Sequence, residues 1–157
     1  MNRQIETIII GGGQAGLAPS YQLMHRGVEH IVLEKAAQAG NAWRNGRWDS
    51  FTLLTPNWSI RIPGAEYKGD APDVFMERNE IAKYFERYVE NFNLPVHYGI
   101  QVTSVEEKAD KHGYLVWSDE DSCIKVKEFR ERMLHKSLCQ SQSRMLVLSL
   151  FTGNQYI

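Results

Sequence analysis

Three glycines near the amino terminus have the spacing that binds the phosphates of a dinucleotide. Gly11, Gly13 and Gly16 form a G-x-G-x-x-G pattern. In this pattern the first glycine permits a tight turn, the second lets a pyrophosphate approach the backbone, and the third allows close packing of helix on strand. Glu34 follows eighteen residues after Gly16, where a carboxylate can accept hydrogen bonds from ribose hydroxyls. The combination predicts a site for an adenine dinucleotide.

The elements around these glycines are those that such a site needs. Residues 7–10 are a β-branched run typical of a strand buried in a parallel sheet. Residues 17–24 carry a helical apolar stripe that stops before Gly27, and residues 30–34 predict a second strand. Pro19 lies inside this helix and is expected to kink it, because proline has no N–H to donate. Strand, helix and strand within about thirty residues predict a βαβ unit.

A long aperiodic segment and a second helix come next. Residues 40–72 are rich in Gly, Pro, Asn and Trp, and a loop of this length in a compact domain is usually functional. Asn79 is the expected N-cap of the helix that follows. The spacing i, i+3, i+4, i+7, i+8, i+11 gives that helix one apolar face. The face consists of Ile81, Tyr84, Phe85, Tyr88, Val89 and Phe92.

Four short strand-like segments complete the periodic part of the chain. They span residues 96–98, 102–106, 114–118 and 123–129. The acidic turn 119–121 is expected to close a hairpin between the last two. The fold class is therefore predicted to be α/β, a Rossmann-like βαβ domain that combines a parallel sheet with a β-meander.

The composition excludes several classes of partner. The 157 residues carry a formal net charge of −1, so no strong field attracts nucleic acid or an anionic membrane. No run of about 18 apolar residues could span a bilayer, and the short run 8–10 is no export signal. Cys123 and Cys139 lack metal-ligand spacing and are expected to be reduced thiols in a cytoplasmic protein.

The glycine pattern alone does not choose between FAD and NAD, but later segments resemble one family. Residues 40–44 (Gly-Asn-Ala-Trp-Arg) are similar to the G-G-x-W-R element of flavin-containing monooxygenases and their bacterial relatives. Residues 49–55, the stretch from Pro72 to Phe92, and residues 102–105 also resemble segments of that family. The resemblance runs from about residue 7 to residue 129. An NAD-dependent dehydrogenase is therefore the less favoured interpretation.

This resemblance implies FAD as the cofactor. The glycine loop would hold the pyrophosphate and Glu34 the ribose, while Val102 would meet the adenine through its backbone. Trp43 and its neighbours would line the path toward the flavin, although core packing is the alternative interpretation of Trp43 and Trp48. The residues assigned to FAD in this way are Gly11, Gly13, Gln14, Ala15, Gly16, Glu34, Lys35, Ala42, Trp43, Arg44, Leu54, Thr55 and Val102.

The resemblance also implies an activity and its partners. Family members reduce FAD with NADPH, activate O₂ on the flavin, and transfer one oxygen to a small-molecule substrate. The flavin carries the chemistry, so no side chain is assigned a catalytic role. The five histidines form no metal or Ser/His/Asp constellation in the sequence. The alternative is a non-catalytic fragment that binds an adenine dinucleotide without turnover.

The resemblance weakens after residue 129. The family continues with a strand that ends in an A-T-G turn, and later with a second glycine pattern for NADPH. Residues 130–138 are charged instead, and the apolar run 146–150 leads into Phe151-Thr152-Gly153, with phenylalanine where alanine is expected. We therefore expect an incomplete FAD-binding domain over residues 1–129, a divergent tail over 130–157, and no NADPH site in this chain. A frameshift or truncation is an alternative source of the tail.

Overall fold

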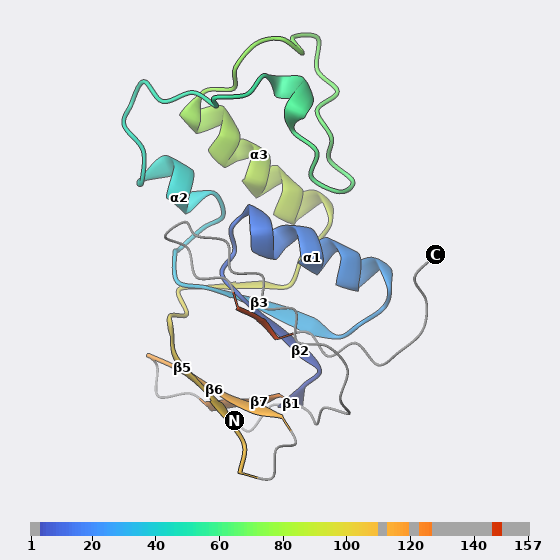
Figure 1. The fold of residues 1–157 in the computed structure, drawn as a ribbon, viewed down its shortest axis with the longest axis vertical. Helices are drawn as coiled ribbons and strands as arrows, with labels where there is room; N and C mark the ends of the chain where they lie inside the picture. The colour runs from blue at the N-terminus through green and yellow to red at the C-terminus, as the bar shows by residue number, and fades with distance from the viewer. Residues whose placement is uncertain (1–3, 110–112, 120–122, 127–145, 149–157) are drawn as a thin grey trace.

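The computed structural model describes residues 4–109, 113–119, 123–126 and 146–148. The elements lie in three layers, with helices over one face of a central sheet and a second sheet below the other face (Figure 1). In chain order they are β1 (Gln4–Ile5), β2 (Thr7–Ile10), α1 (Gln14–His25), β3 (His30–Glu34), α2 (Asn41–Arg44), the 3₁₀ turn η1 (Asn57–Ser59), α3 (Arg78–Asn91), β4 (Val96–Tyr98), β5 (Val102–Glu107), β6 (Tyr114–Ser118), β7 (Cys123–Val126) and β8 (Leu146–Leu148).

The central sheet has the order β4-β3-β2-β8. Strands β2, β3 and β4 are parallel, with Ile8 opposite Ile31 and Val32 opposite Val96. The crossover from β2 through α1 to β3 confirms the predicted βαβ unit. Strand β8, part of the apolar run near the carboxyl terminus, pairs with β2 in the antiparallel direction. The rest of the predicted tail lies outside the described residues.

The second sheet has the order β1-β7-β6-β5. Strands β5, β6 and β7 form the predicted antiparallel meander, and β6 and β7 are the two arms of the predicted hairpin. Residues 120–122 of its turn lie outside the described residues. The two-residue strand β1 pairs in parallel with β7, a contact that the sequence pattern did not predict.

Alternate side chains of the central strands face different layers. Ile8 and Leu33 pack toward the second sheet, where they meet Val116 of β6. Ile9 and Val32 pack with Leu23 of α1 on the opposite face. Because layers cover both faces of the sheet, residues 8–10 of β2 and 31–33 of β3 are continuous apolar runs without alternating polar residues.

Helix α1 ends as its sequence predicts. Gly27 has φ +67°, and its N–H donates to the carbonyl of Met24 at 3.0 Å. The N–H of Val28 donates to the carbonyl of Leu23, also at 3.0 Å. These two bonds form a Schellman motif, which favours glycine at the left-handed position. The helix runs through Pro19 from Gln14 to His25.

Helix α3 begins earlier than predicted. Its N-cap is Glu77 and not Asn79, which lies inside the first turn. The Glu77 carboxylate accepts from the backbone of Glu80, and the Glu80 carboxylate accepts from the Glu77 N–H at 3.3 Å. This capping box satisfies two backbone donors at the helix start. The earlier start has a long-range cause, since Glu77 forms a β-bridge with Thr52.

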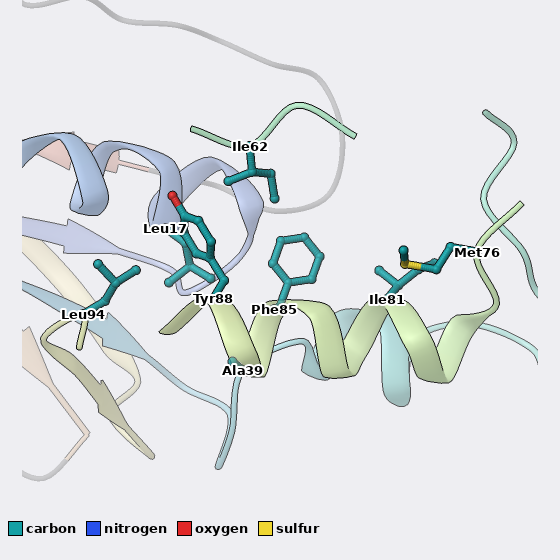
Figure 2. Packing of buried hydrophobic residues seen from close by; sticks show 8 residues of the cluster. All are labelled: Leu17, Ala39, Ile62, Met76, Ile81, Phe85, Tyr88 and Leu94. Atoms are coloured by element: carbon teal, nitrogen blue, oxygen red, sulfur yellow. The ribbon is translucent and has the colours of Figure 1, made fainter. Parts of the chain in front are cut away.

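The apolar face of α3 is the centre of the largest core cluster. Ile81, Phe85 and Tyr88 are buried as predicted. Figure 2 shows them along one side of α3, facing α1 and the segment that follows α2. The cluster of buried residues comprises Leu17, Ala39, Ile62, Met76, Ile81, Phe85, Tyr88 and Leu94.

Two tyrosines of α3 hold the long segment between α2 and α3 in place. The Tyr88 hydroxyl donates to the carbonyl of Pro63 at 2.8 Å, and the Tyr84 hydroxyl donates to the carbonyl of Ala65. Desolvation, with a smaller effect of the nearby Glu66 carboxylate, raises the pKa of Tyr84 to about 12. Both phenols therefore stay protonated, and remain donors, throughout the physiological pH range.

Candidate dinucleotide site

The glycine loop lies between the end of β2 and the start of α1. Gly11 has φ +102° and donates its N–H to the carbonyl of Leu33 at 2.8 Å. A Cβ on Gly16 would overlap the carbonyl oxygen of Gly11. The first glycine therefore makes the turn, and the third permits the close approach of helix to strand, as the motif predicts.

The amino terminus of α1 is open to a ligand. Gly13 is the N-cap and provides no side-chain acceptor, so the first N–H groups of the helix point outward without a cap. Gly13, Gln14 and Ala15 are exposed. A Cβ on Gly13 would meet no atom within 4 Å. The free N–H groups and the positive end of the helix dipole together suit an anion such as a phosphate.

Glu34 ties this loop to the end of β3. One carboxylate oxygen accepts from the N–H of Gly12 at 2.5 Å, and the other accepts from the N–H of Ala36 at 2.8 Å. Each carboxylate oxygen can accept a second hydrogen bond, so the group can also receive a ribose hydroxyl. Gly12 and Ala36 were not among the predicted site residues. Lys35 is exposed beside Glu34.

The segment that leads into β5 lies along the same edge of the sheet. The N–H of Ile100 donates to the carbonyl of Glu34 at 3.0 Å, and the N–H of Gly99 donates to the carbonyl of Ala36 at 3.0 Å. Val102 begins β5 two residues later. The glycine loop, Glu34 and this segment therefore meet at the carboxyl ends of parallel strands, where α/β sheets bind ligands.

Trp43 is placed by the short helix α2, which was not predicted. Gly40 has φ +70°, and a Cβ there would lie 2.8 Å from the Cα of Ala82 on α3. This close approach stacks the Trp43 ring on Phe85, with centroids 6.4 Å apart and planes at 7°. Trp43 thus packs on the core. Trp48 is 66% exposed, so core packing is wrong as an interpretation of that residue.

Three other predicted residues do not join this arrangement. The Arg44 guanidinium forms an ion pair with Glu86 of α3 and therefore anchors α2. Ala42 is exposed, and Leu54 is 89% exposed. None of these three lines the cavity described next.

A cavity of about 120 Å³ lies beside the glycine loop. It is lined by Gln14, Trp43 and Thr55, three residues of the predicted FAD set that come from separate parts of the chain. Arg61 was missed, although its position between Ile60 and Ile62 shows a charge within an apolar segment. The remaining lining residues are Leu53, Ser59, Ile60, Arg61, Ile62, Met76, Ile81, Tyr84 and Phe85.

Two negative findings complete the description of the site. Among the residues that the structure describes, no group of three or more His, Cys, Asp or Glu side chains could hold a metal ion. Within the same part of the chain, no helix is long and apolar enough to cross a membrane.

Comparison with protein families gives one match over most of the chain. The model for the family described as pyridine nucleotide-disulphide oxidoreductase matches residues 8–124. An oxidoreductase described as CzcO-like from Geobacillus kaustophilus is 37% identical over 108 residues. A probable indole-3-pyruvate monooxygenase of Arabidopsis thaliana, YUCCA1, is 32% identical over 87 residues.

Solved structures have the same fold. A flavin monooxygenase variant from Stenotrophomonas maltophilia superposes with a TM-score of 0.71 at 27% identity, over 79% of this chain. Cyclohexanone monooxygenase superposes with a TM-score of 0.68 at 21% identity, which shows likeness of fold. A matched steroid monooxygenase structure is bound to NADP.

The matched region is a minor part of these relatives. The chain spans 30% of the CzcO-like protein and 36% of the Stenotrophomonas enzyme. The region that matches nevertheless contains the βαβ unit, the glycine loop and α3. The chain belongs to the pyridine nucleotide-disulphide oxidoreductase family, within its flavin monooxygenase-like members, for which FAD and NADPH are the cofactors.

Proposed function

We propose that this chain binds FAD and forms the FAD-binding part of a flavin-dependent, NADPH-using monooxygenase. The observation that carries the proposal is the uncapped, exposed amino terminus of α1 beside the Glu34 carboxylate. The helix terminus would hold the pyrophosphate, and the free lone pairs of Glu34 would accept the ribose hydroxyls. The start of β5, at Val102, would lie against the adenine.

The residues of this chain bind and orient the cofactor. When bound, FAD supplies the redox and oxygen-transfer chemistry. The N–H groups at Gly13 to Ala15 would hold the phosphates, and Trp43 and Thr55 would lie beside the flavin end. Oxygenation of a small molecule by O₂ and NADPH is part of the proposal for the whole protein, since this chain spans 30% of the CzcO-like protein and 36% of the Stenotrophomonas enzyme.

A non-catalytic fragment that binds an adenine dinucleotide is the second candidate. Within the described residues, the glycine loop at Gly11–Gly16 is the one dinucleotide fingerprint, and it serves FAD in the proposal above. The two candidates share the same binding site. They differ in whether NADPH has a site of its own, which kinetics can decide.

Gly13→Val should abolish FAD binding without unfolding the protein. A Cβ on Gly13 would meet no atom within 4 Å, and the backbone of Gly13 has φ −77°, which valine tolerates. The valine side chain would therefore occupy only the space of the pyrophosphate. Loss of the glycine N-cap should lower the free energy of unfolding by about 1 kcal/mol at most. Quenching of FAD fluorescence measures the affinity, and circular dichroism measures the melting temperature.

Gly16→Ala is the matched control for this experiment. Its Cβ would overlap the Gly11 carbonyl, so it should lower the melting temperature by more than Gly13→Val does. Undiminished FAD affinity in a folded Gly13→Val protein would contradict the placement of the phosphates at this loop.

Glu34→Ala should weaken the binding of FAD by roughly 1–3 kcal/mol, because hydrogen bonds to a charged acceptor are lost. FMN lacks the adenosine ribose, so its affinity should stay within the error of the wild-type value. Isothermal titration calorimetry with both flavins tests this difference. Equal losses for FAD and FMN would show that Glu34 acts only by holding the Gly12 amide and the loop.

NADPH should reduce the bound flavin of this chain slowly and without saturation. Efficient hydride transfer needs the nicotinamide to be positioned to within about 0.5 Å of its productive geometry, and the glycine loop is already assigned to FAD. Anaerobic stopped-flow would follow loss of the oxidised flavin band, and the rate should rise linearly with NADPH concentration. A hyperbolic rate that saturates at micromolar NADPH would reveal a nicotinamide site in this chain.

A further inference from the structure

A groove of about 230 Å³ lies between α3 and residues 64–68, which form its wall. None of its lining residues belongs to the set assigned to FAD, and Tyr84 is the one residue that it shares with the cavity beside the glycine loop. The volume is below the roughly 300–1,000 Å³ of pockets for drug-sized ligands. The groove therefore suits a smaller molecule.

The wall of this groove is held in a fixed position. The hydroxyls of Tyr84 and Tyr88 donate to the carbonyl groups of residues 65 and 63, and Figure 2 shows the Tyr88 ring standing on α3. Gly64 has φ +82°, and a Cβ there would lie 2.5 Å from the Tyr21 ring in the second half of α1. The glycine loop is at the beginning of that helix, about 10 Å away at 1.5 Å per residue. The groove is therefore preorganised and separate from the phosphate-binding end of α1.

Four polar side chains line the groove from its two sides. Glu66 and Lys68 come from the wall, and Arg87 and Asn91 lie about one turn apart on the same face of α3. None of the four side chains forms a hydrogen bond or an ion pair with a residue that the structure describes. Glu66 thus pairs with neither cation of the groove, and both signs of charge remain available to a ligand.

Aromatic rings form the floor of the groove next to the Glu66 carboxylate. The floor consists of Tyr84, Tyr88 and Phe92, and the last two rings meet edge to face with centroids 5.1 Å apart. Burial is the main reason that the pKa of Tyr84 is raised, and the nearby Glu66 carboxylate adds to it. An ammonium group of a ligand can therefore contact this carboxylate and the negative face of a ring together.

We propose that this groove binds a free α-amino acid, with its ammonium group at Glu66 and its carboxylate between Arg87 and Lys68. Arginine and lysine both donate hydrogen bonds to carboxylates, and arginine can do so through two parallel bonds. A ligand with only a negative charge would be repelled by Glu66, and one with only a positive charge by the two cations. A zwitterion satisfies both signs at once, while its side chain lies on the aromatic floor.

Leucine tests the proposal, with N-acetylleucine and leucinamide as probes that each lack one of its two charges. Amide NMR titration of the full chain should show saturable shifts at residues 64–68 and 87–92. Leucine should bind about two- to fivefold more tightly than either derivative, the range for ion pairs at exposed positions. Equal affinities for the three compounds, or no saturable shift in these two ranges, would overturn the proposal.

Two variants separate the two charge contacts. Glu66→Gln should remove the preference for leucine over N-acetylleucine, and Arg87→Gln should lower the preference for leucine over leucinamide. Both residues are exposed, so the variants should fold, which their melting temperatures will show. Glu90→Gln and Lys83→Gln are the matched controls, because these exposed residues of α3 do not line the groove. Unchanged preferences in the first two variants, or equal losses in the controls, would contradict the proposal.

Competition with FAD distinguishes this site from the dinucleotide site. The affinity for leucine should be the same with and without saturating FAD, because the two sites lie at opposite ends of α1. Displacement of leucine by FAD would show that the groove belongs to the dinucleotide site, and would overturn the proposal while supporting FAD binding. A chain that binds leucine in the groove but does not bind FAD would support this proposal and refute the proposed function.

Discussion

The hydrogen bond from the Gly12 amide to the Glu34 carboxylate is the contact on which the site depends. It joins the loop after β2 to the end of β3 at 2.5 Å, and its partner bond to Ala36 fixes the carboxylate from the other side. The loop amide is buried, so loss of its acceptor would leave an unsatisfied donor, at a cost of about 1–3 kcal/mol. One carboxylate thus holds the loop in place before any ligand arrives.

The three layers keep this contact in register. The parallel pairing of β2 with β3 sets the loop next to Glu34, and core packing on both faces fixes those strands. The absence of a side chain at Gly16 lets α1 start directly at the loop. The helix terminus and the carboxylate are therefore held by rigid elements and not by loop contacts alone, as a preorganised binding site requires.

The sequence predicted those elements whose structure depends on residues near one another in the chain. The βαβ unit, the apolar face at Ile81 and Phe85, and the β6–β7 hairpin follow from periodicity and turn residues. The glycine pattern and Glu34 identified the loop because the turn, the close approach of helix to strand and the hydrogen-bond acceptor each require a particular residue type. In these regions propensity and tertiary packing favour the same structure.

Other features depend on contacts between distant segments, which periodicity does not reveal. Strand β1 exists because it pairs with β7 more than a hundred residues later. The N-cap at Glu77 follows from its bridge to Thr52, and Arg61 reaches the cavity because Tyr84 and Tyr88 anchor the segment around Pro63. A short helix such as α2 needs its packing against α3 to form, since four residues are too few for intrinsic helix stability.

The most direct test of the account is an amide NMR titration of the chain with ADP, the diphosphate-bearing half of FAD. The account predicts saturable, one-to-one binding, with the largest ¹⁵N–¹H shifts at Gly12, Gly13, Gln14 and Ala15. Saturable binding whose shifts fall away from the glycine loop, or no shift at those amides, would contradict it.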